Sequence, residues 1–118
     1  LLAGGFLHID DNYGMDKYLR VEMKKVFPEL DFIELPLDHN IYNIIYSFEN
    51  GLPKIHEHDN RPSQGLGLIK NGKLVCFYTY ECNLGDGWED ALVHNNSQQK
   101  RQEALRMGAN IISFALTK

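Results

Sequence analysis

The chain has 118 residues, a length typical of one domain, and its 43% hydrophobic and 24% charged residues are ordinary for a globular protein. Its 16 acidic against 12 basic residues give a net charge of −4, and no basic cluster exceeds Lys24-Lys25, which argues against a nucleic-acid-binding face. The longest apolar runs are about five residues, far short of the roughly 20 that cross a bilayer, so we expect no membrane span in this chain.

The first part of the chain predicts a strand, a helix and a second strand. Residues 1–5, "LLAGG", are typical of a helix end with its glycine cap, which favours a chain that begins inside a larger domain. Residues 6–10, "FLHID", then predict a short strand. Apolar residues at helical spacing over residues 15–27, followed by Pro28 as a stop, predict an amphipathic helix. Residues 31–35, "DFIEL", predict the second strand.

The middle of the chain predicts a long loop and then a hairpin. Residues 36–64 are irregular and carry three of the four prolines, with one short apolar helix expected in "IYNIIYSF". The dipeptide Asn71-Gly72 between two β-rich runs is a strong signal for a two-residue hairpin turn. We therefore expect strands near residues 66–70 and 73–80.

The end of the chain predicts a loop and a helix. Residues 82–96 carry Gly, Asp and Asn and are expected to form a loop. Ser97 can cap a helix over residues 98–116. One apolar stripe of this helix is made by Leu105, Gly108, Ala109, Ile112 and Ala115, while Met107, Ile111 and Phe114 widen it, so we expect the helix to be covered on more than one side.

This order of elements predicts one α/β domain over residues 1–118, most simply a mostly parallel sheet with helices on its faces. In such sheets ligands gather at the edge where the parallel strands end. Asp10 and Asp11 follow the first strand and are expected at such an edge.

The turn that contains Asp10, Asp11 and Tyr13 has two interpretations. A strand-to-helix turn is where α/β proteins place ligand-binding and catalytic groups, so these residues could hold a ligand or a metal. Asp and Asn are equally the residues that cap helices and close turns. Covalent catalysis is disfavoured because neither Ser nor Cys occupies the turn.

The segment "IHEHD" places His56 and His58 on either side of Glu57. Alternate residues of an extended strand project to one side, so the two imidazoles could bind a transition metal with Asp59 or a distant carboxylate. The spacing is not diagnostic, and a polar surface loop is the simpler interpretation.

The stretch "TYECNLGDGWED" carries Glu81 and Asp86 close to Trp88, just after a predicted strand. The register of an EF-hand calcium loop is absent. Acids around a Trp platform suit a polar ligand such as a sugar or a peptide, whereas the same Trp could plug the core.

Cys76 and Cys82 are predicted to be free thiols, because their spacing fits neither a CxxC redox pair nor a zinc knuckle. On one extended segment they would point to the same face, roughly 20 Å apart, which is too far for a disulfide. Cys82 as a nucleophile would need a base such as His39 or His56 nearby.

The motifs also resemble a known family. In chain order they are "GGFLHIDDNYG", "YLRVEMKKVFP", "LPLDH", "GLPKIHEHD", "FYTYECNLGDGWED" and "ALRMGANIISFAL". Together they resemble, over nearly the whole chain, the bacterial family catalogued as domain of unknown function 4159, found notably in Bacteroidetes.

The resemblance implies a fold and a location. That family is placed near the class I glutamine amidotransferase-like proteins, whose three-layer, flavodoxin-like α/β sheet has flanking helices. Its members usually start with a signal peptide and about two further βα units. The resemblance thus implies that this chain is the C-terminal portion of the domain, with its N-terminal βα units missing, and that the protein is extracytoplasmic, in the periplasm or at the outer membrane.

The resemblance also bears on activity. In amidotransferases of this fold the turn after a central strand holds a catalytic Cys, whereas the equivalent turn here places Asp10 and Asp11 there, so we expect no glutaminase activity. The stretch "LPLDHNIY", which contains His39, resembles the His-Pro-aliphatic stretch of relatives suspected of binding carbohydrate-like ligands, although Asn40 replaces the Pro.

Our leading hypothesis is a noncatalytic module for ligand binding or assembly, with no cofactor and with a small polar ligand, a protein partner or a second copy of the chain as candidate partners. Its acid-rich cleft is predicted to be lined by Asp10, Asp11, Tyr13, His39, Glu57, Glu81, Asp86 and Trp88. The alternative is a hydrolase, metal-assisted or not, in which Asp10 or Asp11 acts with His56 or His58. A third interpretation is an assembly component that pairs an edge strand of the hairpin with a partner.

Overall fold

The structure is a computed structural model that describes residues 5–11, 15–55, 62–88 and 97–117. Several predictions fall wholly or partly outside these residues, among them the irregular stretch 36–64 and the loop over residues 82–96. The others concern most of the helix end predicted at residues 1–5, the side chain of Tyr13, and the segment that contains His56, Glu57 and His58.

The protein has an α/β fold built on a four-stranded open sheet with strand order β1-β4-β3-β2. The strands are β1 (Leu7–Asp10), β2 (Ile33–Glu34), β3 (Gln64–Lys70) and β4 (Lys73–Tyr80). β1 runs parallel to β4, whereas β3 is antiparallel to both of its neighbours. The α/β class is thus confirmed, but the expected mostly parallel sheet is wrong, because the hairpin forces β3 to run against β4.

The hairpin itself is confirmed. Asn71 and Gly72 both adopt positive φ angles, 53° and 79°, the conformation that a tight two-residue hairpin turn requires. Glycine has no side chain to oppose this backbone, and asparagine tolerates it better than most residues. The predicted strands near 66–70 and 73–80 correspond closely to β3 and β4.

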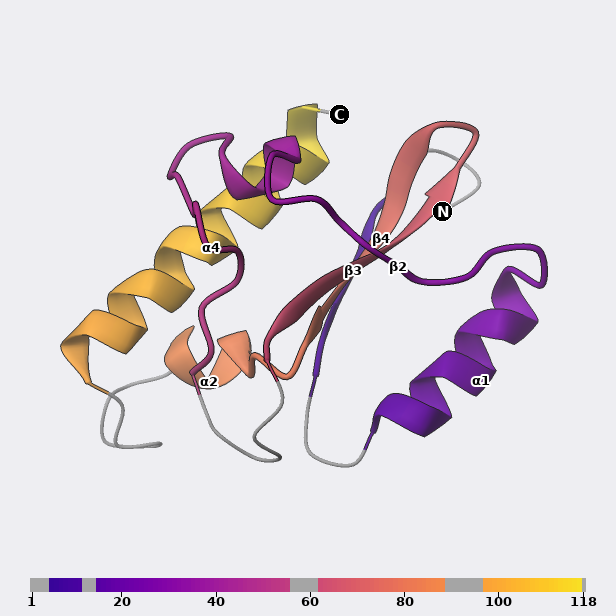
Figure 1. The fold of residues 1–118 in the computed structure, drawn as a ribbon, viewed down its shortest axis with the longest axis horizontal. Helices are drawn as coiled ribbons and strands as arrows, with labels where there is room; N and C mark the ends of the chain where they lie inside the picture. Colours follow the sequence, from indigo (N-terminus) through magenta and orange to yellow (C-terminus); the bar gives the residue numbers. More distant parts are fainter. Residues whose placement is uncertain (1–4, 12–14, 56–61, 89–96, 118) are drawn as a thin grey trace.

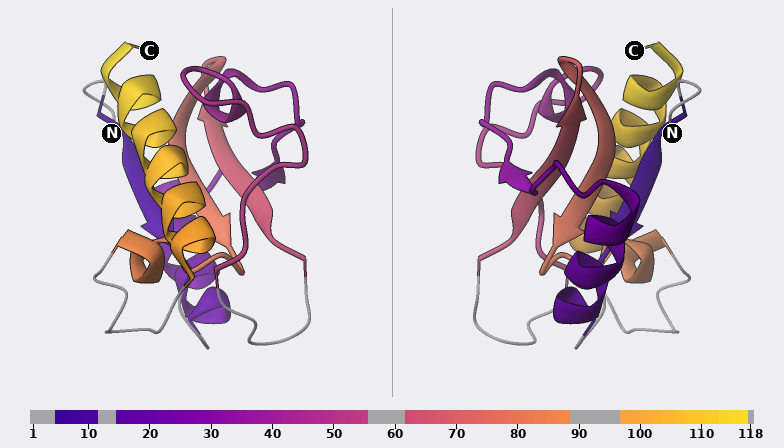
Figure 2. Two further views of the ribbon diagram at one scale, coloured as in Figure 1. Left: turned by 90° about the vertical axis from the view of Figure 1, so that its left-hand side faces the viewer. Right: turned by 90° about the vertical axis from the view of Figure 1, so that its right-hand side faces the viewer.

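Helices cover both faces of the sheet (Figures 1 and 2). One face is covered by α1 (Asp16–Val26), and the other by α2 (Leu84–Trp88), α4 (Gln98–Thr117) and the short 3-10 helix η1 (Asn40–Tyr42). Because side chains alternate along β1, Leu7 and Ile9 pack into the cluster beneath α1, whereas Phe6 packs into the cluster on the α4 side. Among the described residues, none of these helices has the length and apolar character needed to cross a membrane.

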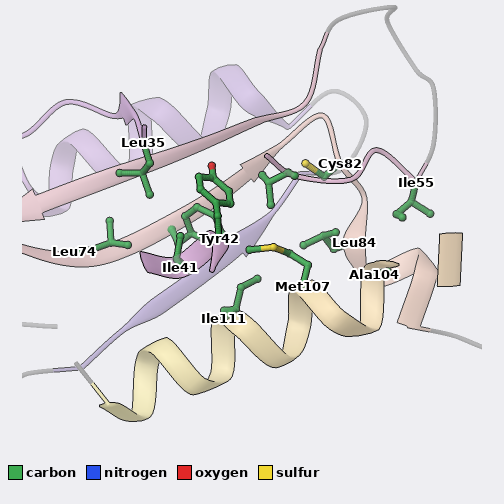
Figure 3. Close-up of a cluster of buried hydrophobic side chains, with 12 residues drawn as sticks. Leu35, Ile41, Tyr42, Ile55, Leu74, Cys82, Leu84, Ala104, Met107 and Ile111 are labelled. Carbon is green, nitrogen blue, oxygen red and sulfur yellow. The ribbon is translucent and has the colours of Figure 1, made fainter. Parts of the chain in front are cut away.

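The larger core lies between the sheet and α4 (Figure 3). Its buried members are Leu35, Ile41, Tyr42, Leu52, Ile55, Leu74, Phe77, Cys82, Leu84, Ala104, Met107 and Ile111. The buried Asn110 belongs to the same face of α4: its Oδ1 accepts from the backbone amides of Ile45 and Tyr46, and its Nδ2 donates to Tyr46 O. A polar side chain therefore fastens the loop after η1 to the final helix.

The final helix turns a different side to the core than its apolar stripe predicts. Met107 and Ile111 are buried, whereas Leu105 and Ile112 are 52% and 62% exposed. The expectation that this stripe is covered is therefore wrong within the described structure. The predicted cap is confirmed, because the amide of Lys100 donates to Ser97 Oγ over 3.2 Å.

Three shorter elements also differ from expectation. A short apolar helix was expected in "IYNIIYSF", but the structure forms only η1 at the start of this stretch. The strand expected over residues 31–35 is reduced to the two residues of β2. Within the expected loop at 82–96, residues 84–88 form α2. Sequence periodicity cannot reveal so short a helix, and its start is held by the distant side chain of Asp10.

Candidate functional site

Asp10 and Asp11 lie where the two parallel strands end together. Asp10 is paired with Thr79 in the β1–β4 ladder, and the amide of Asp11 donates to Thr79 O over 3.1 Å. Because successive side chains of a strand point to opposite faces, the two adjacent carboxylates separate. Asp10 turns toward α2, and Asp11 toward the α1 side of the sheet.

Asp10 anchors the start of α2. Its Oδ1 accepts from the Thr79 hydroxyl over 2.7 Å and from the amide of Leu84 over 3.0 Å, and its Oδ2 accepts from the amide of Gly85 over 2.8 Å. These amides open a helix and have no partner within it, so a carboxylate satisfies them as a cap does. Both oxygens of Asp10 are thus engaged by the protein itself.

The same carboxylate is linked to a histidine that the sequence reasoning missed. His8 Nε2 lies 3.1 Å from Thr79 Oγ1. The Thr79 hydroxyl donates its single proton in a hydrogen bond to Asp10 and therefore accepts a hydrogen bond from His8. The ring proton of His8 is then on Nε2, and Nδ1 carries a lone pair. Burial lowers the pKa of His8 despite the opposing charge of Asp10. The sequence signal that could have found His8 is its spacing of two residues from Asp10, because this spacing puts both side chains on the same face of β1.

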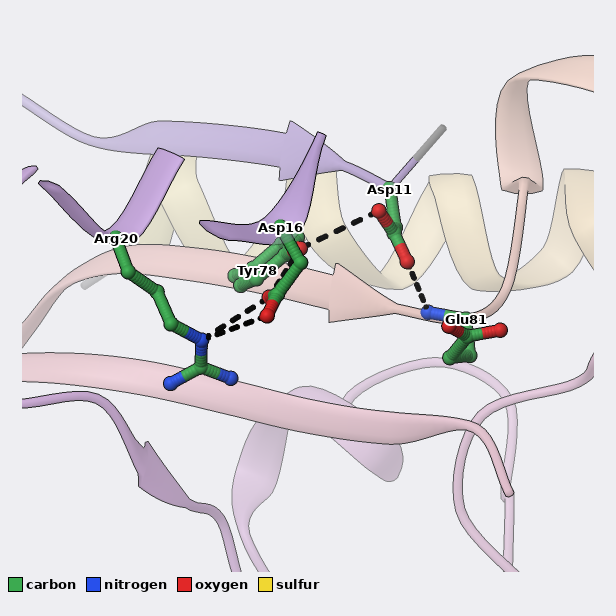
Figure 4. A network of polar contacts seen from close by, with 5 residues as sticks. All are labelled: Asp11, Asp16, Arg20, Tyr78 and Glu81. Carbon is green, nitrogen blue, oxygen red and sulfur yellow. Dashed lines mark hydrogen bonds and ion pairs between the residues drawn. The ribbon is translucent and has the colours of Figure 1, made fainter. Parts of the chain in front are cut away.

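Asp11 belongs to a second polar network, on the α1 side of the sheet (Figure 4). Its Oδ2 accepts from the amide of Glu81 over 2.9 Å, and the Tyr78 hydroxyl lies 3.3 Å from its Oδ1 and 2.8 Å from Asp16 Oδ1. Asp16 also pairs with Arg20 Nε at 3.0 Å. The network joins the carboxyl edge of the sheet to the first turns of α1.

Burial raises the pKa of Asp11 above the ordinary value of 3.8, against the two hydrogen bonds that stabilise its carboxylate. The negative charges of Asp16 and Asp10 add to the rise. Burial, and the acceptance of its proton by Asp16, also hold the pKa of Tyr78 far above its ordinary value. The Tyr78 hydroxyl therefore keeps its proton and lies between the carboxylates of Asp11 and Asp16.

Glu81 lies directly after β4, in a backbone turn with a positive φ of 61°. Its Oε2 is 3.8 Å from Lys54 Nζ, and the amide of the neighbouring Ile55 donates to Cys82 O over 2.9 Å. The segment that leads to residue 55 therefore lies against the same carboxyl edge as Asp10 and Asp11.

The two cysteines are free and buried, as predicted. They do not share a face: Cys76 packs in the cluster beneath α1, and Cys82 packs in the core on the α4 side, because the turn at Glu81 reverses the alternation of the strand. Burial raises the pKa of Cys76 to about 12 and that of Cys82 further still. Neither thiol has the thiolate character that a nucleophile needs.

Trp88 is neither a core plug nor a fully exposed platform. Its Nε1 donates to Ala104 O of α4 over 2.7 Å, and its ring lies against Gly108, where a Cβ would approach it to 3.2 Å. The residue is 39% exposed, and the centroid of its ring lies 6.0 Å from that of the His8 ring. Asp86 is in α2 with Trp88 and is half-buried.

Trp88 and His8 line an apolar groove of about 590 Å³ between β1 and α4. The rest of its lining is Phe6, Leu105, Gly108, Ala109, Ile111, Ile112, Ala115 and Leu116. Except for the His8 imidazole and the Trp88 N–H, these side chains are apolar. The groove lies on the face of the sheet that Asp10 also faces, beside the edge strand β1.

His39 lies at the opposite end of the molecule from this carboxyl edge. Its ring is 5.5 Å from that of Phe114, which in turn is 5.8 Å from Phe6, just before β1 begins. Its Nδ1 accepts from the amide of Ile41 and so caps η1, and burial lowers its pKa. The structure therefore brings together Asp10, Asp11 and Glu81, with Asp86 and Trp88 following in α2, but it does not bring His39 to them.

Two of the predicted site residues, Tyr13 and Glu57, lie outside the described residues, as do His56 and His58. Within the parts of the chain that the structure describes, no group of three or more His, Cys, Asp or Glu side chains is gathered as a metal site requires. A metal site that uses "IHEHD" stays a prediction.

Comparison with known protein families matches residues 1–116 to the domain of unknown function DUF4159. The chain is a member of this family. The comparison with curated proteins found no match.

The match to DUF4159 reaches from before β1 into the last turn of α4, so both polar networks and the groove lie within the family domain. The family description assigns no activity to the domain.

Proposed function

We propose that this DUF4159 chain is a noncatalytic module for binding and assembly, and that it binds through the groove between β1 and α4. The observation that carries the proposal is the exposure of large apolar side chains along this groove: Ile112 is 62% exposed and Leu116 80%. Contiguous apolar surface of this kind is typical of interaction sites, because leaving it in water is unfavourable.

The acid-rich edge supports the noncatalytic part of the proposal. Asp10 and Asp11 accept hydrogen bonds from backbone amides and hold the fold together, and the described thiols are buried with raised pKa values. An acid at the position of the amidotransferase cysteine cannot repeat the thiol chemistry, so we propose that the chain has no glutaminase activity.

The proposal extends to the wider resemblance. We place the chain in the class I glutamine amidotransferase-like superfamily, as the C-terminal portion of a flavodoxin-like domain whose further βα units precede it, in an extracytoplasmic protein. The order of the motifs, from "GGFLHIDDNYG" to "ALRMGANIISFAL", supports this assignment.

The alternative, an Asp/His hydrolase, has one favourable observation: the chain of hydrogen bonds from Asp10 through Thr79 to His8. It is tested by ammonia release from L-glutamine and by hydrolysis of p-nitrophenyl acetate, each with and without added Zn²⁺ or Mn²⁺. We expect no turnover. Turnover that His8→Ala abolishes in a folded protein would replace our proposal with the hydrolase.

The binding proposal is tested with the groove's own reporter, because Trp88 is the sole Trp of the chain. The probe is anilinonaphthalene sulfonate, a dye whose apolar ring system carries one sulfonate and which accepts excitation energy from a nearby indole. We expect energy transfer from Trp88 to the bound dye. Ile112→Asp places a charge in the groove and should lower the affinity for the dye roughly tenfold.

The matched control is Val21→Asp, on α1 and 57% exposed, on the other face of the sheet. It introduces the same charge and should leave the energy transfer unchanged. Equal losses in the two variants, or no transfer in the parent protein, would contradict the groove as the binding surface.

A further inference from the structure

A pocket of about 480 Å³ lies at the other edge of the sheet from the groove, beside β2 and the start of β3. Its walls come from residues 34–37, from Tyr42 of η1, from residues 50–52 and from residues 63–65. We propose that this pocket binds a small organic cation, a protonated alkylamine. The inference goes beyond the proposed function, because it concerns a different surface and a different ligand.

The hydroxyl of Tyr42 is the first reason for a ligand. Tyr42 is 1% exposed, and its ring packs edge-on against that of Phe77 in the larger core. Figure 3 shows the hydroxyl directed away from α4 and toward the sheet. No described residue donates to this hydroxyl or accepts from it. Buried hydroxyls ordinarily have a hydrogen-bond partner, and Tyr42 lines the pocket, so a partner can come from there.

Gly65 of β3 makes room for the same hydroxyl. A Cβ at position 65 would collide with the hydroxyl oxygen of Tyr42 and would lie 3.0 Å from Cε1 of Phe77. A phenylalanine at position 42 would fill the core as well and would not place an oxygen against β3. Packing alone therefore does not call for the combination of a tyrosine with a facing glycine.

The other polar groups of the pocket favour a ligand that donates hydrogen bonds and is positively charged. Ser63 Oγ donates its proton to Leu52 O over 2.8 Å, so it offers only lone pairs to a ligand. Among the described residues that line the pocket, Glu34 is the one with a formal charge. Burial raises the pKa of Tyr42, and the charges of Cys82 and Glu34 add to the rise. The hydroxyl therefore lies in the field of a carboxylate, which favours an ammonium beside it.

The rest of the ligand is expected to be a short apolar chain. Leu35, Leu37 and Leu52 supply apolar walls, and the volume is within the range of small-molecule pockets. An ammonium has three N–H donors for the acceptors of the pocket, and an alkyl chain suits the leucines. The net charge of −4 also favours cations over anions near this protein.

The test is an NMR titration of the whole chain, labelled with nitrogen-15, with ligands that share one hexyl chain. Hexylamine carries a positive charge and several N–H donors, 1-hexanol is neutral with one donor, and hexanoate is an anion. We expect hexylamine to shift the amide signals of Gly51 and Gly65 saturably. Hexanol should bind roughly tenfold more weakly, and hexanoate should leave these signals unchanged.

Two variants test the protein side of the contact. Tyr42→Phe removes the hydroxyl and keeps the ring, so the affinity for hexylamine should fall roughly tenfold. Thermal melting should show no loss of stability, because no described residue uses this hydroxyl. Glu34→Gln removes the charge and should abolish most of the preference for hexylamine over hexanol.

The matched controls lie on α1, away from the pocket. Tyr18→Phe removes a hydroxyl from a residue that is 65% exposed, and Glu22→Gln removes one negative charge from an exposed side chain. Both should leave the affinity for hexylamine unchanged. The ligand series also tests the inference on the parent protein, without any variant.

Three results would overturn the inference. Equal affinity for hexylamine and hexanol would show that the pocket does not select a cation. Unchanged affinity for hexylamine in a folded Tyr42→Phe variant would show that the hydroxyl does not bind the ligand. Hexylamine that shifts the emission of Trp88 but not the signals of Gly51 and Gly65 would occupy the groove beside β1 instead, which leaves the proposed function standing.

Discussion

At the scale of single residues, Asp10 and Asp11 show how neighbours in sequence can have separate tasks. The strand-to-helix turn favoured a shared site, and the chemistry of Asp also allowed capping. The structure gives both carboxylates backbone amides to bind, one on each face of the sheet. Sequence placed them correctly at the edge of the sheet, but it could not identify donors that are about 70 residues away along the chain.

Replacing Asp10 by Asn should destabilise the protein. One oxygen would become an NH₂ group that faces a backbone or hydroxyl donor, so we expect Asp10→Asn to lower the free energy of unfolding by about 1–3 kcal/mol. Urea denaturation measures the loss. The control is Asp31→Asn, which breaks an exposed ion pair with Lys24 and should cost less than about 1 kcal/mol. Equal losses in the two variants would contradict the anchoring role.

The buried Asp11 predicts a pH dependence of defined sign. Its pKa is raised in the folded protein, so between 3.8 and that raised value the folded state holds a proton that the unfolded chain has released. The contribution of Asp11 to the free energy of unfolding therefore falls as the pH rises through this window and is constant above it.

Carbon-13 NMR of the Asp11 carboxyl group measures this titration directly. We expect a midpoint above 3.8, and we expect Asp11→Asn to remove this part of the pH dependence of stability. A midpoint at or below 3.8 would show that the hydrogen bonds from Glu81 and Tyr78 outweigh burial.

At the scale of elements, helical periodicity identified α1 and α4 well, with ends that differ by only a residue from those observed. It did not identify which side of α4 faces the sheet. Apolar residues lie on two sides of this helix, so the hydrophobic pattern alone gives no preference between Leu105 and Met107. The buried Asn110 decides the matter through its bonds to the loop at Ile45 and Tyr46, a long-range contact that no pattern encodes.

The packing of α2 on α4 depends on Gly87. A Cβ at this position would collide with the Cβ of Ala104 and would lie 3.5 Å from Ile55. We expect Gly87→Ala to separate the two helices, to lower the free energy of unfolding by about 1–3 kcal/mol, and to shift the emission of Trp88. Urea denaturation and fluorescence measure both effects.

The control for Gly87→Ala is Gln102→Ala, an exposed position of α4, where stability should change by less than about 0.5 kcal/mol and the emission should not move. An unchanged stability in Gly87→Ala would mean that the two helices can move apart at little cost.

At the scale of the whole molecule, the sequence predicted the α/β class and the hairpin but not the strand order. Element order favoured a parallel sheet, whereas the tight turn at Asn71 and Gly72 requires an antiparallel neighbour, and β1 then joins β4 from the other side. Which strand becomes the edge depends on contacts between distant segments. For that reason the groove beside β1, and the part that His8 has in it, could not be read from local patterns.

The paired acids after β1 also have a consequence for how the sheet is assembled. If β1 slid by one position along β4, its side chains would exchange faces, and each carboxylate would meet the wrong layer of helices. The amides of Leu84 and Gly85 on one side and of Glu81 on the other would lose their acceptors together. The two neighbouring aspartates thus fix the register of β1 on β4. The apolar residues of a strand of only four residues specify that register weakly on their own.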